Sequence, residues 1–172
     1  MKKWVLFEKH LTYTLILMGL YIVQATPGML EVLGNKPLLV LPAVVCIAMH
    51  EGNFLGGIYG LVGGVFCDLS AFTYFGFNAL LFLLIGVGVG LLVEYLMHNN
   101  SLNALQLTLW AMLIKSVVEY FFMYGIWGYD GARLIYLHKL IPVTIYSLLF
   151  VPLFYKMLLK LSGRYARKLQ IR

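Results

Sequence analysis

Three ionisable residues, Asp68, Lys115 and Glu119, fall inside apolar stretches of this chain, where lipid would reject a charge. Charged side chains within a membrane are rare, face protein or water, and usually pair with one another. Lys115 and Glu119 stand four residues apart, so on a helix they share one face and can form an ion pair. Such a group could bind a substrate or relay protons, or it could be a neutralised cluster that fixes how the helices pack. The spacing leaves both interpretations open.

Other residues with chemical potential do not fall into a known catalytic pattern. His50 and Glu51 are adjacent, but no second histidine follows four residues after His50, so the zinc-protease pattern is not met. Cys46 and Cys67 lie in apolar runs without a Cys-x-x-Cys or Cys/His spacing, which favours a packing role. Nothing beside the charged residues resembles a nucleophile, a metal cage or a cofactor loop. We therefore expect no enzyme activity, no cofactor and no metal.

The elements that must position these residues are membrane helices. Of the 172 residues, 62% are hydrophobic and only 12% are charged, which is typical of a chain that lies in a bilayer. We expect an all-α, polytopic membrane protein with one domain, 1–172. Its six transmembrane helices are predicted at approximately 10–26, 37–50, 52–69, 76–97, 102–126 and 139–161. The second span is short and contains Pro42, so we expect it to be kinked, tilted or partly re-entrant.

Positive charge gathers at both ends of the chain and indicates how it is oriented. Nine of the 13 Lys and Arg residues lie toward the two ends: Lys2, Lys3, Lys9, Lys156, Lys160, Arg164, Arg167, Lys168 and Arg172. An even number of spans and the positive-inside rule then place both termini in the cytoplasm, with the loops 27–36 and 127–138 outside. This placement argues against nucleic acid as a partner. The basic row Lys160, Arg164, Lys168 and Arg172 suits a helix end that lies on anionic lipid, or one that only fixes orientation.

Depth along the helices brings the three intramembrane charges to one level. At about 1.5 Å per residue, Asp68 lies about 24 Å from Gly52, the start of its span. Lys115 and Glu119 lie about 20 and 25 Å from Leu102. We therefore expect these three side chains to form one polar network in the outer half of the bundle.

Glycines at four-residue spacing predict close helix packing. A ridge without side chains costs helix stability unless another helix packs against it, and in lipid such small-xxx-small rows are a usual packing device. We expect the two rows to pack against each other or against a partner's helix. They consist of Gly52, Gly56, Gly60 and Gly64 in the third span, and of Gly86 and Gly90 in the fourth.

Residues 58–78, IYGLVGGVFCDLSAFTYFGFN, resemble the rod shape-determining protein MreD family. The family pattern there is a glycine-rich helix, an acid followed by Leu, a short polar turn, and a glycine that opens the next helix. The positions are filled here by Gly60, Gly64, Asp68 and Gly76. Two further stretches match as well: VVEYFFMYG places Glu119 at the family's acidic position, and HKLIPVTIYS places Pro142 early in the last span, where we expect a kink.

The resemblance implies a non-enzymatic scaffold subunit of the bacterial cell-elongation complex, in the plasma (inner) membrane. Such a subunit binds MreC, sits with the RodA glycosyltransferase and a class B penicillin-binding protein, and couples indirectly to MreB. It thereby helps to organise peptidoglycan synthesis and cell shape. The MreD fold is similar to that of the S components of energy-coupling-factor vitamin transporters, so a substrate-binding S component is the alternative. The first span lacks the Ala-xxx-Ala pair through which S components dock, which favours the scaffold.

Overall fold

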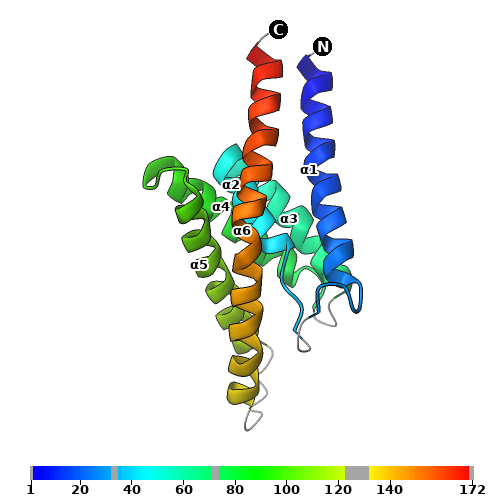
Figure 1. The fold of residues 1–172 in the computed structure, drawn as a ribbon, viewed down its shortest axis with the longest axis vertical. Coiled ribbons are helices and arrows are strands. Elements are labelled where there is room, and N and C mark those ends of the chain that lie inside the picture. The colour runs from blue at the N-terminus through cyan, green and yellow to red at the C-terminus, as the bar shows by residue number, and fades with distance from the viewer. Residues whose placement is uncertain (1, 32–34, 71–73, 123–131, 171–172) are drawn as a thin grey trace.

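The computed structural model describes residues 2–31, 35–70, 74–122 and 132–170, which form an all-helical bundle without a strand in these ranges (Figure 1). Six helices follow one another: α1 (Lys2–Ala25), α2 (Val40–Glu51), α3 (Asn53–Ser70), α4 (Phe77–Tyr95), α5 (Ser101–Tyr120) and α6 (Ala132–Gln170). The predicted all-α class is confirmed. The end of the predicted fifth span and residues 127–131 of the predicted loop 127–138 lie outside the described residues, whereas 132–138 belong to α6.

Among the residues that the structure describes, four stretches are long and apolar enough to cross a membrane: Lys3–Ala25, Phe77–Tyr95, Ser101–Tyr120 and Leu140–Lys168. Large apolar side chains are exposed along these helices, as expected for a surface that faces lipid. The two ends of the chain lie at the same end of the bundle, where α1 and α6 rise side by side beyond the other helices (Figure 1). We call this the terminal end and the opposite one the distal end.

Helix α2 forms the centre of the bundle. Its 12 residues span only about 18 Å, well short of the roughly 30 Å hydrocarbon core of a bilayer. Every residue from Val40 through Met49 is buried, because α2 packs against α3, α4, α5 and α6. A helix that is apolar on all sides is typically buried by other protein segments, as α2 is here.

Pro42, where we expect a kink, lies at the beginning of α2. Pro42 is the third residue of α2, in the first helical turn, where its missing N–H would have had no partner in the helix. Pro142 lies within α6, and so does Pro152, which sequence reasoning did not single out. The helix continues through both prolines, although each of them removes one backbone hydrogen bond.

Side chains from α1 and α6 cap the start of α2. Gln24 Oε1 accepts hydrogen bonds from the backbone N–H of Leu39 (2.7 Å) and of Val40 (3.1 Å). Ser147 Oγ accepts another from the N–H of Leu38, at 2.7 Å. The first N–H groups of a helix have no partner within it, and lipid offers none. These two side chains therefore allow a helix to begin inside the bundle.

Helices α3 and α4 meet backbone to backbone. A Cβ atom added to Gly60 would lie 2.2 Å from the carbonyl oxygen of Phe82, and one added to Gly64 would lie 2.4 Å from Cα of Ala79. A Cβ on Gly86 would lie 2.2 Å from the carbonyl oxygen of Gly56. No side chain larger than hydrogen fits at these positions without moving one helix away from the other. We call this contact the glycine seam.

The ends of the glycine seam differ from the predicted row. Gly52 is not part of a continuous helical ridge, because it links α2 to α3 with φ +87°, a value that residues with a Cβ rarely adopt. Gly90 packs against this link, since a Cβ there would lie 2.3 Å from Cα of Asn53. The chain thus turns sharply at Gly52, and the seam extends up to that turn.

Candidate functional site

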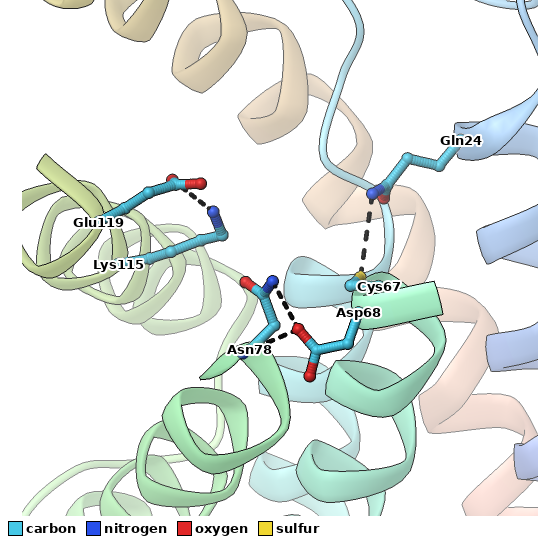
Figure 2. Close-up of polar contacts among 6 residues, drawn as sticks. All are labelled: Gln24, Cys67, Asp68, Asn78, Lys115 and Glu119. Carbon is cyan, nitrogen blue, oxygen red and sulfur yellow. Dashed lines mark hydrogen bonds and ion pairs between the residues drawn. The ribbon is translucent and has the colours of Figure 1, made fainter. Parts of the chain in front are cut away.

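Asp68 caps the start of α4 from the end of α3. Its carboxylate accepts hydrogen bonds from the backbone N–H groups of Gly76 (3.0 Å), Asn78 (3.1 Å) and Ala79 (3.1 Å), and from Asn78 Nδ2 (2.9 Å). Figure 2 shows the Asp68 side chain directed at Asn78 and the first turn of α4. The side chain is buried, and its negative charge lies at the positive end of the helix dipole. One carboxylate therefore accepts hydrogen bonds from several N–H groups for which lipid offers no acceptor.

Gly76 makes this cap possible. It has φ +94°, a conformation that residues with a Cβ rarely adopt, and it directs the chain into α4. Asp68 and Gly76 stand eight residues apart in the sequence, and the Asp68 carboxylate accepts a hydrogen bond from the Gly76 N–H. The acid and the glycine of the sequence motif thus act together in one turn.

Lys115 and Glu119 form an ion pair within α5. Lys115 Nζ lies 2.7 Å from Glu119 Oε2. The lysine side chain is 9% exposed and the glutamate side chain 30%, so the pair is buried at one end and open at the other. Each charge is neutralised by a neighbour one helical turn away.

The single polar network expected from depth is not what the structure shows. Asp68 makes no hydrogen bond or ion pair with Lys115 or Glu119; its hydrogen bonds go to α4. Figure 2 shows Asn78 between Asp68 and the Lys115–Glu119 pair. The Asn78 amide nitrogen binds Asp68, while its carbonyl oxygen is buried without a hydrogen-bond partner. The three predicted residues therefore belong to two separate units, the Asp68 cap and the α5 ion pair.

Near the Asp68 cap and the α5 ion pair, aromatic side chains hold α4 and α5 together. The ring centroids of Phe77 and Phe122 lie 5.6 Å apart, in an edge-to-face arrangement. This contact joins the beginning of α4 to the end of α5. The Asp68 cap and the α5 ion pair therefore belong to the same, distal end of the bundle.

A second polar centre, which sequence reasoning missed, lies at the terminal end. Glu51, the last residue of α2, forms an ion pair with Lys9 of α1, and its side chain is only 6% exposed. Tyr13 of α1 donates a hydrogen bond to the same carboxylate, over 2.7 Å. Tyr59 of α3 packs edge-on against Tyr13, and its hydroxyl lies 2.6 Å from His10 Nδ1. We call these five residues the terminal junction.

Little in the sequence predicts the terminal junction. Lys9 and Tyr13 stand four residues apart on one face of α1, and Glu51 is an acid at the end of an apolar run. The contacts between them nevertheless span 38 to 49 residues, so no local spacing could join them. Glu51 falls between the predicted spans 37–50 and 52–69, whereas the structure places it in the last turn of α2.

A third group of contacts ties the end of α2 to the turn before α5. Asn99 Nδ2 donates a hydrogen bond to the backbone oxygen of Met49 at 2.9 Å and lies 3.0 Å from His50 Nδ1. Tyr155 of α6 donates a hydrogen bond to the backbone oxygen of Asn99 at 2.8 Å. These contacts place Tyr155 of α6 at the level of the α4–α5 turn.

In the distal and the terminal polar centres the buried charges are paired or hydrogen-bonded. Each buried charge named above has an opposite charge or a set of backbone N–H donors as its partner. Within the described ranges, no three His, Cys, Asp or Glu side chains gather in a way that could hold a metal ion. Comparisons with protein-family models, with curated proteins and with solved structures found no match.

Proposed function

We propose that this protein is a non-enzymatic membrane scaffold subunit of the bacterial cell-elongation complex, similar to the MreD family. One observation carries the proposal. The residues on which the sequence resemblance rests form a helical hairpin: Gly60 and Gly64 join α3 to α4, and Asp68 with Gly76 builds the turn between them. This arrangement supports a role in shape and assembly, because the carboxylate of Asp68 already accepts hydrogen bonds from backbone N–H groups.

The proposed partners follow from the same resemblance. The protein binds MreC, and through it stays with the RodA glycosyltransferase, a class B penicillin-binding protein and, indirectly, MreB. The glycine seam is occupied within the molecule, so a partner helix has to bind elsewhere. The outer face of α1 offers an apolar stripe that continues over most of the helix and is formed by Phe7, Leu11, Leu15, Met18 and Ile22, all of them exposed.

Co-purification tests the proposal directly. The tagged protein, co-expressed with MreC from the same genome, is crosslinked in native membranes, purified and analysed by quantitative mass spectrometry. We expect MreC in near-stoichiometric amount, and at most traces of it with an unrelated polytopic protein that carries the same tag. A vitamin bound at one-to-one without MreC would contradict the scaffold and favour the S-component alternative.

The proposed location is the bacterial inner membrane, with both termini in the cytoplasm. This orientation follows from the basic residues at the terminal end. Cysteine labelling in intact cells tests it, because Cys46 and Cys67 are buried and give little background. A membrane-impermeant maleimide should label Met29→Cys and leave Asn100→Cys unlabelled. The reverse pattern would place the termini outside.

A further inference from the structure

The side-chain oxygen of Asn78 is buried at the distal end and has no hydrogen-bond partner among the residues that the structure describes. The orientation of this amide is fixed, because its nitrogen must face Asp68 to donate the 2.9 Å hydrogen bond to that carboxylate. Its oxygen therefore lies on the other side, toward the Lys115–Glu119 pair (Figure 2). A buried acceptor without a donor is costly, so this oxygen favours any arrangement that brings it one.

Lys115 is a suitable donor on that side of the amide. Its side chain is buried, and the hydrogen bond to Glu119 uses one of the three N–H groups of its ammonium. The four-carbon stem of a lysine is flexible, so the ammonium can change its acceptor while the backbone stays in place. Placed between Asp68 and Lys115, the Asn78 amide would direct its N–H toward the anion and its oxygen toward the cation. Both ends of its dipole would then be stabilised.

The two acceptors differ in what else can reach them. Glu119 is partly exposed, so a proton can arrive from outside the bundle, whereas the Asn78 oxygen is closed off. While Glu119 is charged, Lys115 stays with it, because separating opposite charges in a low-dielectric interior is costly. A neutral Glu119 attracts the ammonium much less. The Asn78 oxygen, backed by the negative charge of Asp68, is then the better acceptor.

We infer that Glu119 is a proton-binding site that sets the position of Lys115. A proton from the distal side adds to the Glu119 carboxylate, and Lys115 keeps its own proton. The Lys115 ammonium then moves to the Asn78 oxygen, where Asp68 balances its charge through the Asn78 amide. A contact within α5 is thereby exchanged for one between α5 and α4, so that protonation ties α5 to the Asp68 cap.

Among the described residues, Asp68 on α3 is the other charged group beside the Lys115–Glu119 pair. Glu31 and Lys36, in the segment between α1 and α2, pair with each other. The remaining titratable groups on the facing helices are tyrosines and cysteines, which are uncharged at neutral pH. The facing stretches without a charged residue are 11–25 of α1, 40–49 of α2, 77–93 of α4 and 140–155 of α6.

A double-mutant cycle between Lys115 and Asn78 tests the second position of the lysine. Lys115→Met and Asn78→Ala are combined in the wild type and in Glu119→Gln, which resembles the protonated acid, and the equilibrium constant of unfolding is measured in detergent. We expect a coupling below about twofold in the wild type and of about tenfold in Glu119→Gln. Glu94→Gln, which neutralises an exposed acid of α4, is the matched background and should keep the wild-type coupling.

Hydrogen–deuterium exchange in nanodiscs gives a second measurement, which needs no Asn78 variant. Lowering the pH from about 7 to about 4.5, the range in which glutamates take up protons, should slow exchange at the start of α4 in the wild type. After correction for the intrinsic rates, we expect a change of about threefold or more. In Glu119→Gln the exchange should be slow at both pH values, and in Lys115→Met the change with pH should be lost.

Two results would overturn the inference. A coupling in Glu119→Gln no larger than in the wild type would mean that Lys115 turns toward solvent or lipid headgroups instead of Asn78. A change of exchange with pH that persists in Glu119→Gln would mean that another group, such as Asp68, binds the proton. The proton site goes beyond the proposed scaffold function and does not depend on it, so a failure to co-purify MreC would leave both measurements as they are.

Discussion

The two ends of the bundle are held together in different ways. At the distal end, Asp68 binds N–H groups only 8 to 11 residues further along the chain, and Lys115 pairs within its own helix. At the terminal junction, Glu51 binds residues 42 and 38 positions away, and Tyr59 meets His10 over 49. The contacts of Asp68 and Lys115 are thus local, whereas those of the terminal junction are long-range.

This difference indicates what each end does for the fold. The glycine seam and the Asp68 cap make α3 and α4 a unit of neighbouring helices, which can form before the rest of the chain is placed. The terminal junction fastens α1 to α2 and α3, so it requires that these three helices have packed together. We therefore expect substitutions at the two ends to differ in how much they lower the free energy of unfolding and in which helices they free from one another.

The largest effect is expected at the glycine seam. Gly86→Leu places a Cβ where the carbonyl oxygen of Gly56 lies 2.2 Å away, so the two backbones must separate. We expect a loss of at least about 4 kcal/mol in the free energy of unfolding, measured by SDS titration in detergent, or no folded protein. Gly88→Leu is the control, because a Cβ there meets nothing within 4 Å. It should leave stability unchanged or raise it by up to about 1 kcal/mol. Equal losses for the two variants would show that the seam is not tightly packed.

A smaller but still large effect is expected at Asp68. Asp68→Asn keeps the size of the side chain but directs an NH₂ group at N–H donors and removes the charge at the start of α4. Because hydrogen bonds to a charged group contribute about 1.5–3 kcal/mol each, we expect a loss of about 3 kcal/mol. Glu94→Gln, an exposed acid near the end of the same helix, should change stability by less than about 0.5 kcal/mol. If the two variants cost the same, Asp68 does not cap α4.

The contrast between local and long-range contacts also explains what the sequence could predict. The helices, the α3–α4 packing and the Lys115–Glu119 pair follow from spacings of three to eight residues. Depth along a helix put Asp68 at the level of Lys115, but it does not tell which way each side chain points, and Asp68 points to α4. The burial of α2 was missed for a similar reason. Its shortness and Pro42 suggested a helix that is kinked, tilted or partly re-entrant, whereas the structure shows a short helix that other helices surround.

The smallest effect, and the sharpest test of the comparison, concerns the two ion pairs. Lys9 and Glu51 have side chains 13% and 6% exposed, whereas Lys115 and Glu119 have 9% and 30%. A charge that loses its partner is costly when it stays buried and cheaper when it can reach a polar surrounding. Glu119 is open enough to do so, but Glu51 is not.

Two double-mutant cycles measure this difference. Lys9→Met with Glu51→Gln should show a coupling of about 1.5–3 kcal/mol, because either single change leaves a buried charge that the double change removes. Lys115→Met with Glu119→Gln should show a coupling of about 1 kcal/mol or less. Both cycles use the free energy of unfolding in the same detergent, so the difference in burial is the quantity compared. A larger coupling for the pair within α5 would mean that the distal end, despite its local contacts, holds the more isolated charges. Strictly additive losses at Lys9 and Glu51 would mean that the terminal junction is held by Tyr13, Tyr59 and their packing, with the ion pair contributing nothing of its own.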